Sequence, residues 1–197
     1  MRPATHSPDG ILDAARELVL DGGPRAAGAK PIAAASGAPV GSIYYRFGSR
    51  DGVLAALWVR TVLRFQAAWK APLAIADGLD DPVETGAAMA AAAVAFARTD
   101  PEDVRLLLAV RPRDLLDAHS DELAEGLAEA NADAREALLD LTRAVTGRVS
   151  RASVESVALA VVDLPHGALR RHDGRPPKGL EEEIGNAARL LLRTASA

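Results

Sequence analysis

Apolar residues recur every three or four positions along most of this chain, which is the spacing of one face of an α-helix. The pattern predicts a helix from Ile11 to Gly22, a long helix from Ser49 to about Lys70, and further helices over 82–98, 101–110, 116–145, 154–169 and 180–193. Pro165 should kink or split the helix over 154–169, because proline has no backbone N–H. No alternating strand pattern occurs, so the sequence predicts an all-α fold of about nine helices.

The stretch from Gly28 to Arg50 predicts two short helices joined by a tight turn. Gly37 permits the positive φ that such a turn needs, and Pro39 can open the second helix. The second helix carries hydroxyl and cationic side chains within one turn of each other, namely Ser42, Tyr44, Tyr45 and Arg46. A helix-turn-helix places its second helix in the major groove of DNA, so this stretch is the candidate DNA-binding surface.

Charge and composition narrow the alternatives. The net charge of the chain is -4, but residues 1–50 hold six Lys/Arg against four acidic residues, and the remaining 17 basic and 23 acidic residues make the rest acidic. A basic N-terminal region followed by an acidic remainder is compatible with phosphate contact through one small surface of the N-terminal region. The chain has no cysteine, which excludes disulfides, thiolate metal sites and cysteine nucleophiles. Residues 1–9 lack an apolar run, so we expect a flexible arm and neither a signal peptide nor a membrane anchor.

The N-terminal quarter of the chain resembles the tetracycline-repressor (TetR) family of bacterial transcriptional regulators. The similarity runs from ILDAARELVLDGG through PIAAASGAPVGSIYYRFGSRDGVLAAL, and it includes Ile32-Ala33, Ser36-Gly37, Tyr44 with Phe47, and Ser49-Arg50-Asp51. The resemblance implies a helix-turn-helix DNA-binding domain over 10–50 and an effector-binding and dimerisation domain over 51–197. The second region shares with the family only its helical pattern and its length.

The resemblance also implies which residues contact DNA. The family's contacts map onto residues of the second, third and fourth helices, namely Lys30, Pro39, Val40, Ser42, Tyr44, Tyr45 and Arg50. The hydroxyls can donate to phosphates, Lys30 and Arg50 supply charge, and the helix beginning near Arg50 presents free N–H groups to an anion. Pro39 and Val40 replace the polar residues common in the family, which leaves apolar contact with thymine methyl groups as one option. For each tyrosine, the alternative is a partly buried surface aromatic without a DNA contact.

The body of the chain has no recognisable catalytic or metal-binding pattern. His119 and His166 have no partner at a helical metal-binding spacing, and no nucleophile elbow occurs, so we expect no enzyme activity, metal or cofactor. The resemblance implies instead a pocket for a small-molecule effector, whose candidate walls are Phe65, Trp69, Met89, Phe96, Leu107 and His166. Ordinary core packing is the alternative for each of these residues. Apolar walls would favour a hydrophobic or aromatic effector.

The last predicted helix, 180–193, has an apolar set wider than one buried stripe, which indicates contact with both the body and a second subunit. This pattern predicts a homodimer paired through its last two helices, and the family resemblance implies a bacterial cytoplasmic protein that binds a palindromic DNA operator. We expect a repressor released when the effector binds, with no membrane association. The alternative is a helix-turn-helix regulator without a small-molecule effector, controlled by a partner protein.

Overall fold

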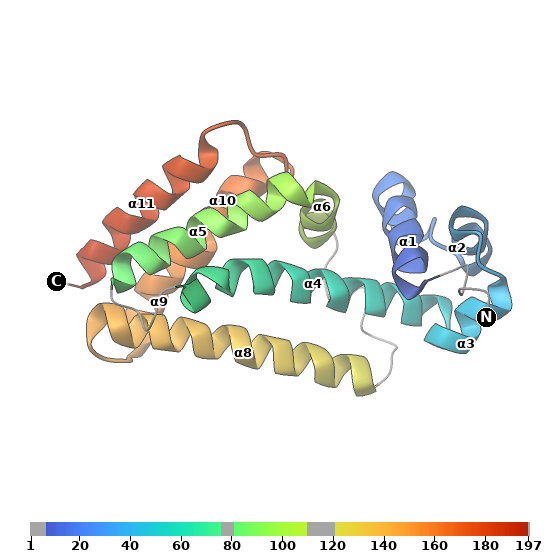
Figure 1. Cartoon of the computed structure of the whole chain (residues 1–197), viewed down its shortest axis with the longest axis horizontal. Coiled ribbons are helices and arrows are strands. Elements are labelled where there is room, and N and C mark those ends of the chain that lie inside the picture. Colours follow the sequence, from blue (N-terminus) through green and yellow to red (C-terminus); the bar gives the residue numbers. More distant parts are fainter. Residues whose placement is uncertain (1–6, 76–80, 110–120, 197) are drawn as a thin grey trace. The chain divides into compact units, whose positions relative to one another are not determined.

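A computed structural model describes residues 7–75, 81–109 and 121–196 of the chain (Figure 1). Within those ranges every regular element is a helix, and counting Arg151–Arg171 as one gives nine, which confirms the all-α prediction. The chain forms two compact units, one of residues 1–62 and 105–128 and the other of residues 63–104 and 129–197. Each unit has a separate hydrophobic core.

The first unit contains the helix-turn-helix. It is built from α1 (Pro8–Gly22), α2 (Ala29–Ser36), α3 (Val40–Phe47), the first half of α4 (Arg50–Ile75) and part of α6 (Pro101–Ala109). The centre of its core consists of residues with no solvent exposure, among them Ile11, Ile32, Ile43 and Val53. Each of the four comes from a different helix, so the core holds α2 and α3 against α1 and α4.

Helix α1 begins three residues before the predicted position. The Ser7 hydroxyl caps it by accepting a hydrogen bond from the Gly10 amide at 3.1 Å, and Pro8 occupies the first helical position, where its missing N–H costs nothing. Residues 8 and 9, which the sequence assigned to a flexible arm, therefore belong to α1, and residues 1–6 lie outside the described range.

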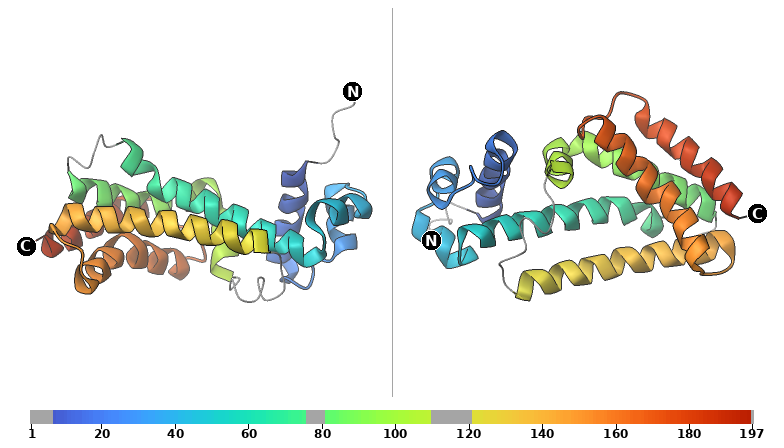
Figure 2. Two further views of the ribbon diagram at one scale, coloured as in Figure 1. Left: turned by 90° about the horizontal axis from the view of Figure 1, so that it is seen from below. Right: turned by 180° about the vertical axis from the view of Figure 1, so that it is seen from behind.

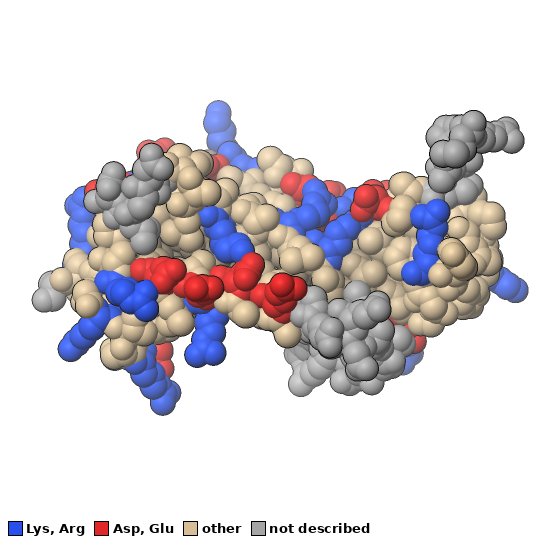
Figure 3. All heavy atoms as spheres, turned by 60° about the horizontal axis from the view of Figure 1, so that its bottom comes forward, with Lys and Arg blue, Asp and Glu red and all other residues tan. Residues whose placement is uncertain are grey.

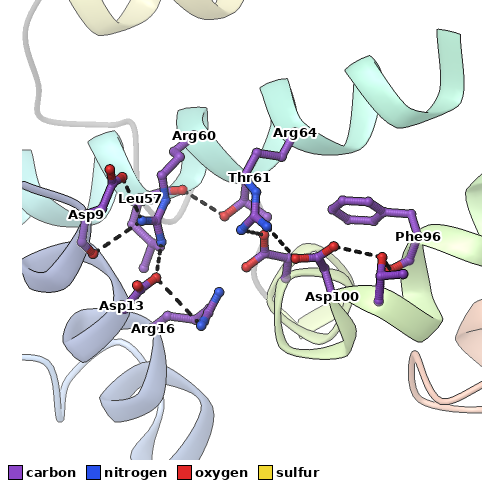
Figure 4. A network of polar contacts seen from close by, with 11 residues as sticks. Asp9, Asp13, Arg16, Leu57, Arg60, Thr61, Arg64, Phe96 and Asp100 are labelled. Carbon is purple, nitrogen blue, oxygen red and sulfur yellow. Dashed lines mark hydrogen bonds and ion pairs between the residues drawn. The ribbon is translucent and has the colours of Figure 1, made fainter. Parts of the chain in front are cut away.

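An arginine on α4 fastens α1 to α4 inside the first unit (Figure 4). The Arg60 guanidinium lies 3.1 Å from the Asp9 carboxylate and 2.8 Å from the Asp13 carboxylate, and Arg16 approaches Asp13 at 3.6 Å. The Arg60 side chain is only 16% exposed, so this ion pair is less screened than one at the open surface. It supplements the apolar packing that orients α1.

The second unit is a bundle in which α5 (Pro82–Thr99) and α11 (Leu180–Ala195) lie side by side (Figure 2). The other members are the second half of α4, α8 (Asp121–Thr146), α9 (Arg151–Ala158), η1 (Leu159–Asp163) and α10 (Leu164–Arg171). Small residues let α5 and α11 approach closely: a Cβ on Gly86 would lie 2.5 Å from a methyl group of Leu192. Met89, Leu141, Val161 and Leu192 are fully buried in this core.

The sequence predicted that Pro165 would disturb its helix, and the structure shows how. Helix α9 continues through the π-helical turn η1 into α10, so the hydrogen-bond spacing changes locally while the helix remains continuous. In a regular α-helix the N–H of residue 165 would bond to the carbonyl of Val161, but proline has no N–H. The indole Nε1 of the buried Trp69 donates to that carbonyl instead, at 3.0 Å.

Helix α4 extends farther than predicted. The sequence places its end near Lys70, before Pro72, whereas the structure continues it to Ile75. Proline in the last turn removes one backbone hydrogen bond but does not stop the helix, since only one turn follows it. Beyond this point the described structure resumes with Asp81, which caps α5 by accepting from the Glu84 amide at 3.0 Å.

Helix α8 carries a row of exposed acidic side chains, visible in Figure 3 as a line of red atoms. The row comprises Glu129, Asp133, Glu136 and Asp140. Lys70 lies 3.6 Å from Asp133, and Arg143 lies 2.7 Å from Asp140. All four carboxylates are exposed to solvent. Residues 116–120, which the sequence places at the start of this helix, lie outside the described range.

A shallow groove of about 480 Å³ lies between α5 and α11 in the second unit. Its floor consists of small residues, including Ala88, Ala91 and Gly185, and an ion pair lies at its rim. There the Arg189 guanidinium donates to Glu84, with its Nη2 at 2.7 Å from the carboxylate. This hydrogen bond lowers the pKa of Glu84 and raises the pKa of Arg189.

Among the described residues, one helix is long and apolar enough to cross a membrane by length and composition alone. It is the continuous helix Arg151–Arg171, with a mean hydropathy of 1.2 over its best window. Only 28% of that window is buried within the unit. Core helices of soluble proteins meet the same criterion, so the measure is weak evidence for a membrane span. The exposed apolar side chains of this helix include Leu159 and Val162.

Candidate nucleic-acid interface

The turn between α2 and α3 is fixed by local hydrogen bonds. Gly37 ends α2 with φ 71°, the left-handed conformation predicted for this position. The Ser36 hydroxyl donates to the Ile32 carbonyl at 2.7 Å and accepts from the Ala38 amide at 3.2 Å. These bonds join the end of α2 to the first residue after the turn, so the direction in which the chain enters α3 is set locally.

Helix α3 has one buried face and one exposed face. Ile43 is fully buried and Phe47 packs against the same core, which fixes the rotation of the helix about its axis. On the opposite side Tyr44 is 48% exposed and Tyr45 is 91% exposed. An aromatic ring left almost wholly in water costs hydrophobic free energy unless a partner covers it. Tyr45 therefore leaves its ring and hydroxyl accessible on the face opposite Ile43.

The predicted contact residues of α2 and α3 gather at this exposed face or near it. Lys30 and Pro39 are exposed, and Val40 and Ser42 are partly exposed. No intramolecular hydrogen bond or ion pair of the Lys30, Ser42 or Tyr45 side chain occurs among the described residues. Their polar atoms are consequently available to a ligand.

Gly41 and Arg46 were not among the predicted DNA contacts, but both are exposed on α3 next to those residues. Gly41 lies exposed in the first turn of α3, and a Cβ built on it would meet no atom within 4 Å. Glycine costs about 1 kcal/mol in a helix relative to alanine, and internal packing does not require it at this position. Arg46 is exposed in the last turn of the same helix, where a cation also suits the helix dipole.

The start of α4 forms a second polar element of the interface. The Ser49 hydroxyl accepts from the Gly52 amide at 2.9 Å and so caps the helix, as predicted. The other amides of the first turn are directed along the helix axis and can bind an anion such as a phosphate. Asp51 adds negative charge to this turn, and Arg50 offsets it through an ion pair.

Arg50 differs from the other predicted contacts because its donors are already engaged. Its Nε donates to the Ala27 carbonyl at 3.1 Å, one Nη donates to the Pro24 carbonyl, and the other pairs with the Asp51 carboxylate. The side chain is 33% exposed. The guanidinium thus lies against the loop between α1 and α2.

The residues predicted to line an effector pocket fall into different environments. Phe65 and Phe96 contact each other edge to face, with ring centroids 5.7 Å apart. Trp69 and Met89 are buried in the core of the second unit. Leu107 packs instead against the core of the first unit, and His166 is exposed on α10. The structure brings four of the six residues into the interior of the second unit.

Metal chemistry finds no support in the part of the chain that the structure describes, where no group of three or more His, Asp or Glu side chains could hold an ion. The charged clusters present there pair carboxylates with arginines. His119, considered above as a ligand, lies outside the described residues.

Comparison with known proteins gives one family match and several solved structures of the same fold. The model of the tetR family of bacterial regulatory proteins matches residues 11–57, which span the helix-turn-helix and the start of α4. The matched segment is about a quarter of the chain, and within it the match agrees with the resemblance drawn from the sequence. A comparison with curated proteins found no match.

Several solved structures of regulatory proteins share the fold over 93–98% of this chain. PfmR of Thermus thermophilus is 19% identical, with a TM-score of 0.71 over 93% of this chain and 97% of its own. The fatty acid degradation regulator FadR of Bacillus halodurans is 18% identical, with a TM-score of 0.68 over 98% and 96%. SmeT, the repressor of a multidrug efflux pump of Stenotrophomonas maltophilia, is 20% identical, with a TM-score of 0.59 over 96% and 88%.

The match indicates a general role for the matched segment. The proteins of that family are bacterial regulatory proteins, and PfmR is a transcriptional regulator. The family match covers the unit that carries the exposed α3 face, so the family and the geometry indicate the same surface.

Proposed function

We propose that this protein is a dimeric repressor that binds a palindromic operator through α3 and is released when a small molecule binds the second unit. The observation that carries the proposal is the face of α3: Tyr45, 91% exposed, next to the freely available Ser42 and opposite the fully buried Ile43. A helix anchored on one side and polar on the other is suited to the major groove. The match of residues 11–57 to a family of bacterial regulatory proteins supports a location in the bacterial cytoplasm, where the DNA target lies.

The DNA contacts are Lys30, Pro39, Val40, Ser42, Tyr44 and Tyr45, supplemented by Arg46 and the free amides of α4. Hydroxyls and cations bind phosphates and fix the register of α3 on the duplex. Val40 and Pro39 offer apolar surface to thymine methyl groups, so base readout through this helix relies less on hydrogen bonds.

The test is fluorescence anisotropy with a labelled duplex from the region upstream of the gene. We expect saturable binding that weakens as salt rises, because phosphate contacts release counterions. Tyr45→Phe removes one hydroxyl donor to a charged group and should weaken binding about ten-fold. Ser156→Ala, which removes an exposed hydroxyl from the second unit, is the matched control and should bind like the parent. Equal affinities for all three proteins would remove Tyr45 from the contact set.

The proposed dimer rests on apolar side chains that the second unit leaves in water. Leu190 is 66% exposed and Leu191 36% exposed on α11, and Leu159 and Val162 are 50% and 40% exposed on the helix before it. Such a surface is stable when a second copy covers it. Two heads related by a two-fold axis would then reach successive major grooves about 34–36 Å apart.

Leu190→Glu should convert the dimer to a monomer, because it would place a charge in an apolar contact. Sedimentation velocity at micromolar concentration measures the change. Ile75→Glu, at an 83% exposed position outside the last two helices, should leave the dimer intact. A parent protein that sediments as a monomer would contradict the proposal.

The proposed effector is a small molecule of hydrophobic or aromatic character, bound among Phe65, Trp69, Met89 and Phe96. Opposition between effector and operator follows from linkage if the two bind different conformations. A thermal-shift screen separates this proposal from control by a partner protein, since only a specific pocket gives saturable stabilisation by a small molecule.

A further inference from the structure

Arg50 makes contacts that reach across the helix-turn-helix. Its acceptors, the carbonyls of Pro24 and Ala27, precede α2 by a few residues, whereas Arg50 itself is the first residue of α4 and follows α3. One side chain therefore ties the segment that enters the motif to the segment that leaves it. The residues between these two segments are 29–47, which form α2, the turn and α3.

The loop between α1 and α2 has few bonds of its own. The Ala26 amide donates to the Gly23 carbonyl at 3.0 Å, and the Gly28 amide donates to the Ala26 carbonyl at 2.9 Å. The backbone bonds of the described residues include none to the carbonyls of Pro24 and Ala27, which Arg50 satisfies. Ala27 is fully buried, and a buried carbonyl without a donor is costly.

This loop leads directly into the start of α2, where Gly28 is the N-cap and has no side chain to stabilise the helix end. Lys30 lies in the first turn of α2 and is a proposed phosphate contact. Holding the loop therefore holds Lys30 and the free amides of α2 in place relative to the start of α4.

We propose that Arg50 is a positioning residue, which sets the α2 N-terminus for DNA binding by holding Pro24 and Ala27, and that it does not act chiefly as a phosphate ligand. The proposal rests on the proposed function for its effect on DNA. Three of the five N–H donors of the guanidinium are used within the protein. The remaining role, fastening the loop, needs the guanidinium and not merely its charge.

Arg50→Lys distinguishes a positioning residue from a phosphate ligand, because it keeps the positive charge and removes the several N–H donors of the guanidinium. Lysine carries a methylene where arginine has Nε, so it cannot donate to Ala27 from that position while also bonding Pro24 and Asp51. A phosphate ligand should tolerate this change, whereas a loop fastener should not.

The first measurement is hydrogen exchange in the full-length protein without DNA. For Arg50→Lys we expect about ten-fold faster exchange of the amides in residues 23–32, with α5 unchanged as an internal standard. Lys30→Ala, which removes a neighbouring cation without an internal contact, should leave exchange in residues 23–32 unchanged. Unchanged exchange in Arg50→Lys would overturn the proposal. Faster exchange spread evenly over α1, α2 and α3 would overturn it too, since Arg50 would then stabilise the whole unit and not the loop in particular.

The second measurement is operator affinity as a function of salt. Arg50→Lys should weaken binding about ten-fold with the salt slope of the parent, because the charge is retained; Lys30→Ala should weaken binding and reduce the slope by about one phosphate contact. Parent-like affinity in Arg50→Lys would show that charge alone suffices and would overturn the positioning role. If the parent itself binds no DNA, the proposed function fails, but hydrogen exchange still decides whether Arg50 fastens the loop.

Discussion

Arg64→Met is expected to lower the free energy of unfolding of the second unit by about 2–3 kcal/mol. Arg64, on α4, pairs with Asp103 and Asp100 at the start of α6, as part of the network in Figure 4. The Asp103 side chain is fully buried, and methionine would remove the Arg64 guanidinium that pairs with its carboxylate. The expected loss is less than that for a wholly buried pair, because Arg64 is itself 41% exposed and the N-terminus of α6 also favours a negative charge.

Denaturant unfolding followed by circular dichroism measures this loss. The matched control is Arg143→Met, which breaks an exposed pair with Asp140 whose side chains are 63% and 52% exposed. Surface pairs of this kind contribute about 0–1 kcal/mol, so the control should change stability little. Equal effects of the two substitutions would mean that the burial of Asp103 carries no electrostatic cost.

Trp69→Phe is expected to cost about 2 kcal/mol of stability in the same unit. It removes the indole donor from the Val161 carbonyl and so breaks a hydrogen bond in the interior of the unit. Trp58→Phe is the control for lost volume, since Trp58 is similarly buried at 4% but makes no indole hydrogen bond within the described residues. The difference between the two losses in free energy of unfolding measures the contribution of the Trp69 hydrogen bond.

A double-mutant cycle with Pro165→Ala tests the mechanism directly. Alanine restores an N–H at residue 165 that can donate to the Val161 carbonyl, so Trp69→Phe should cost about 1 kcal/mol less in that background. Additive effects of the two substitutions would show that Trp69 does not compensate for the proline.

Features that depend on residues close together in the sequence could be predicted, whereas features that depend on distant residues could not. The turn after α2 could be predicted, because Gly37 and Pro39 act through their own φ angles. The buried position of Ile43 and the exposure of Tyr45 were accessible too, since both follow from the phase of one helix. Each of these features depends on residues within a few positions of each other.

Features that depend on distant residues could not be predicted in the same way. The sequence indicated that Pro165 would disturb its helix, but the donor that compensates for it, Trp69, is 92 residues away. Arg50 was assigned to DNA through the family resemblance, and its bonds to carbonyls 23 and 26 residues earlier are visible only in three dimensions. The same limit applies to the pocket residues, since helical spacing did not indicate that Leu107 packs in one core and Met89 in the other.

If the protein binds DNA as proposed, the acidic row of α8 has a consequence for how it meets an operator. The row holds four exposed carboxylates, two of which pair with Lys70 and Arg143, so negative charge prevails there and repels the sugar-phosphate backbone of a duplex that approaches that helix. Encounters through α8 should therefore be shorter than encounters through the helix-turn-helix. Because salt screens both the repulsion and the attraction, we expect this difference to be largest at low ionic strength.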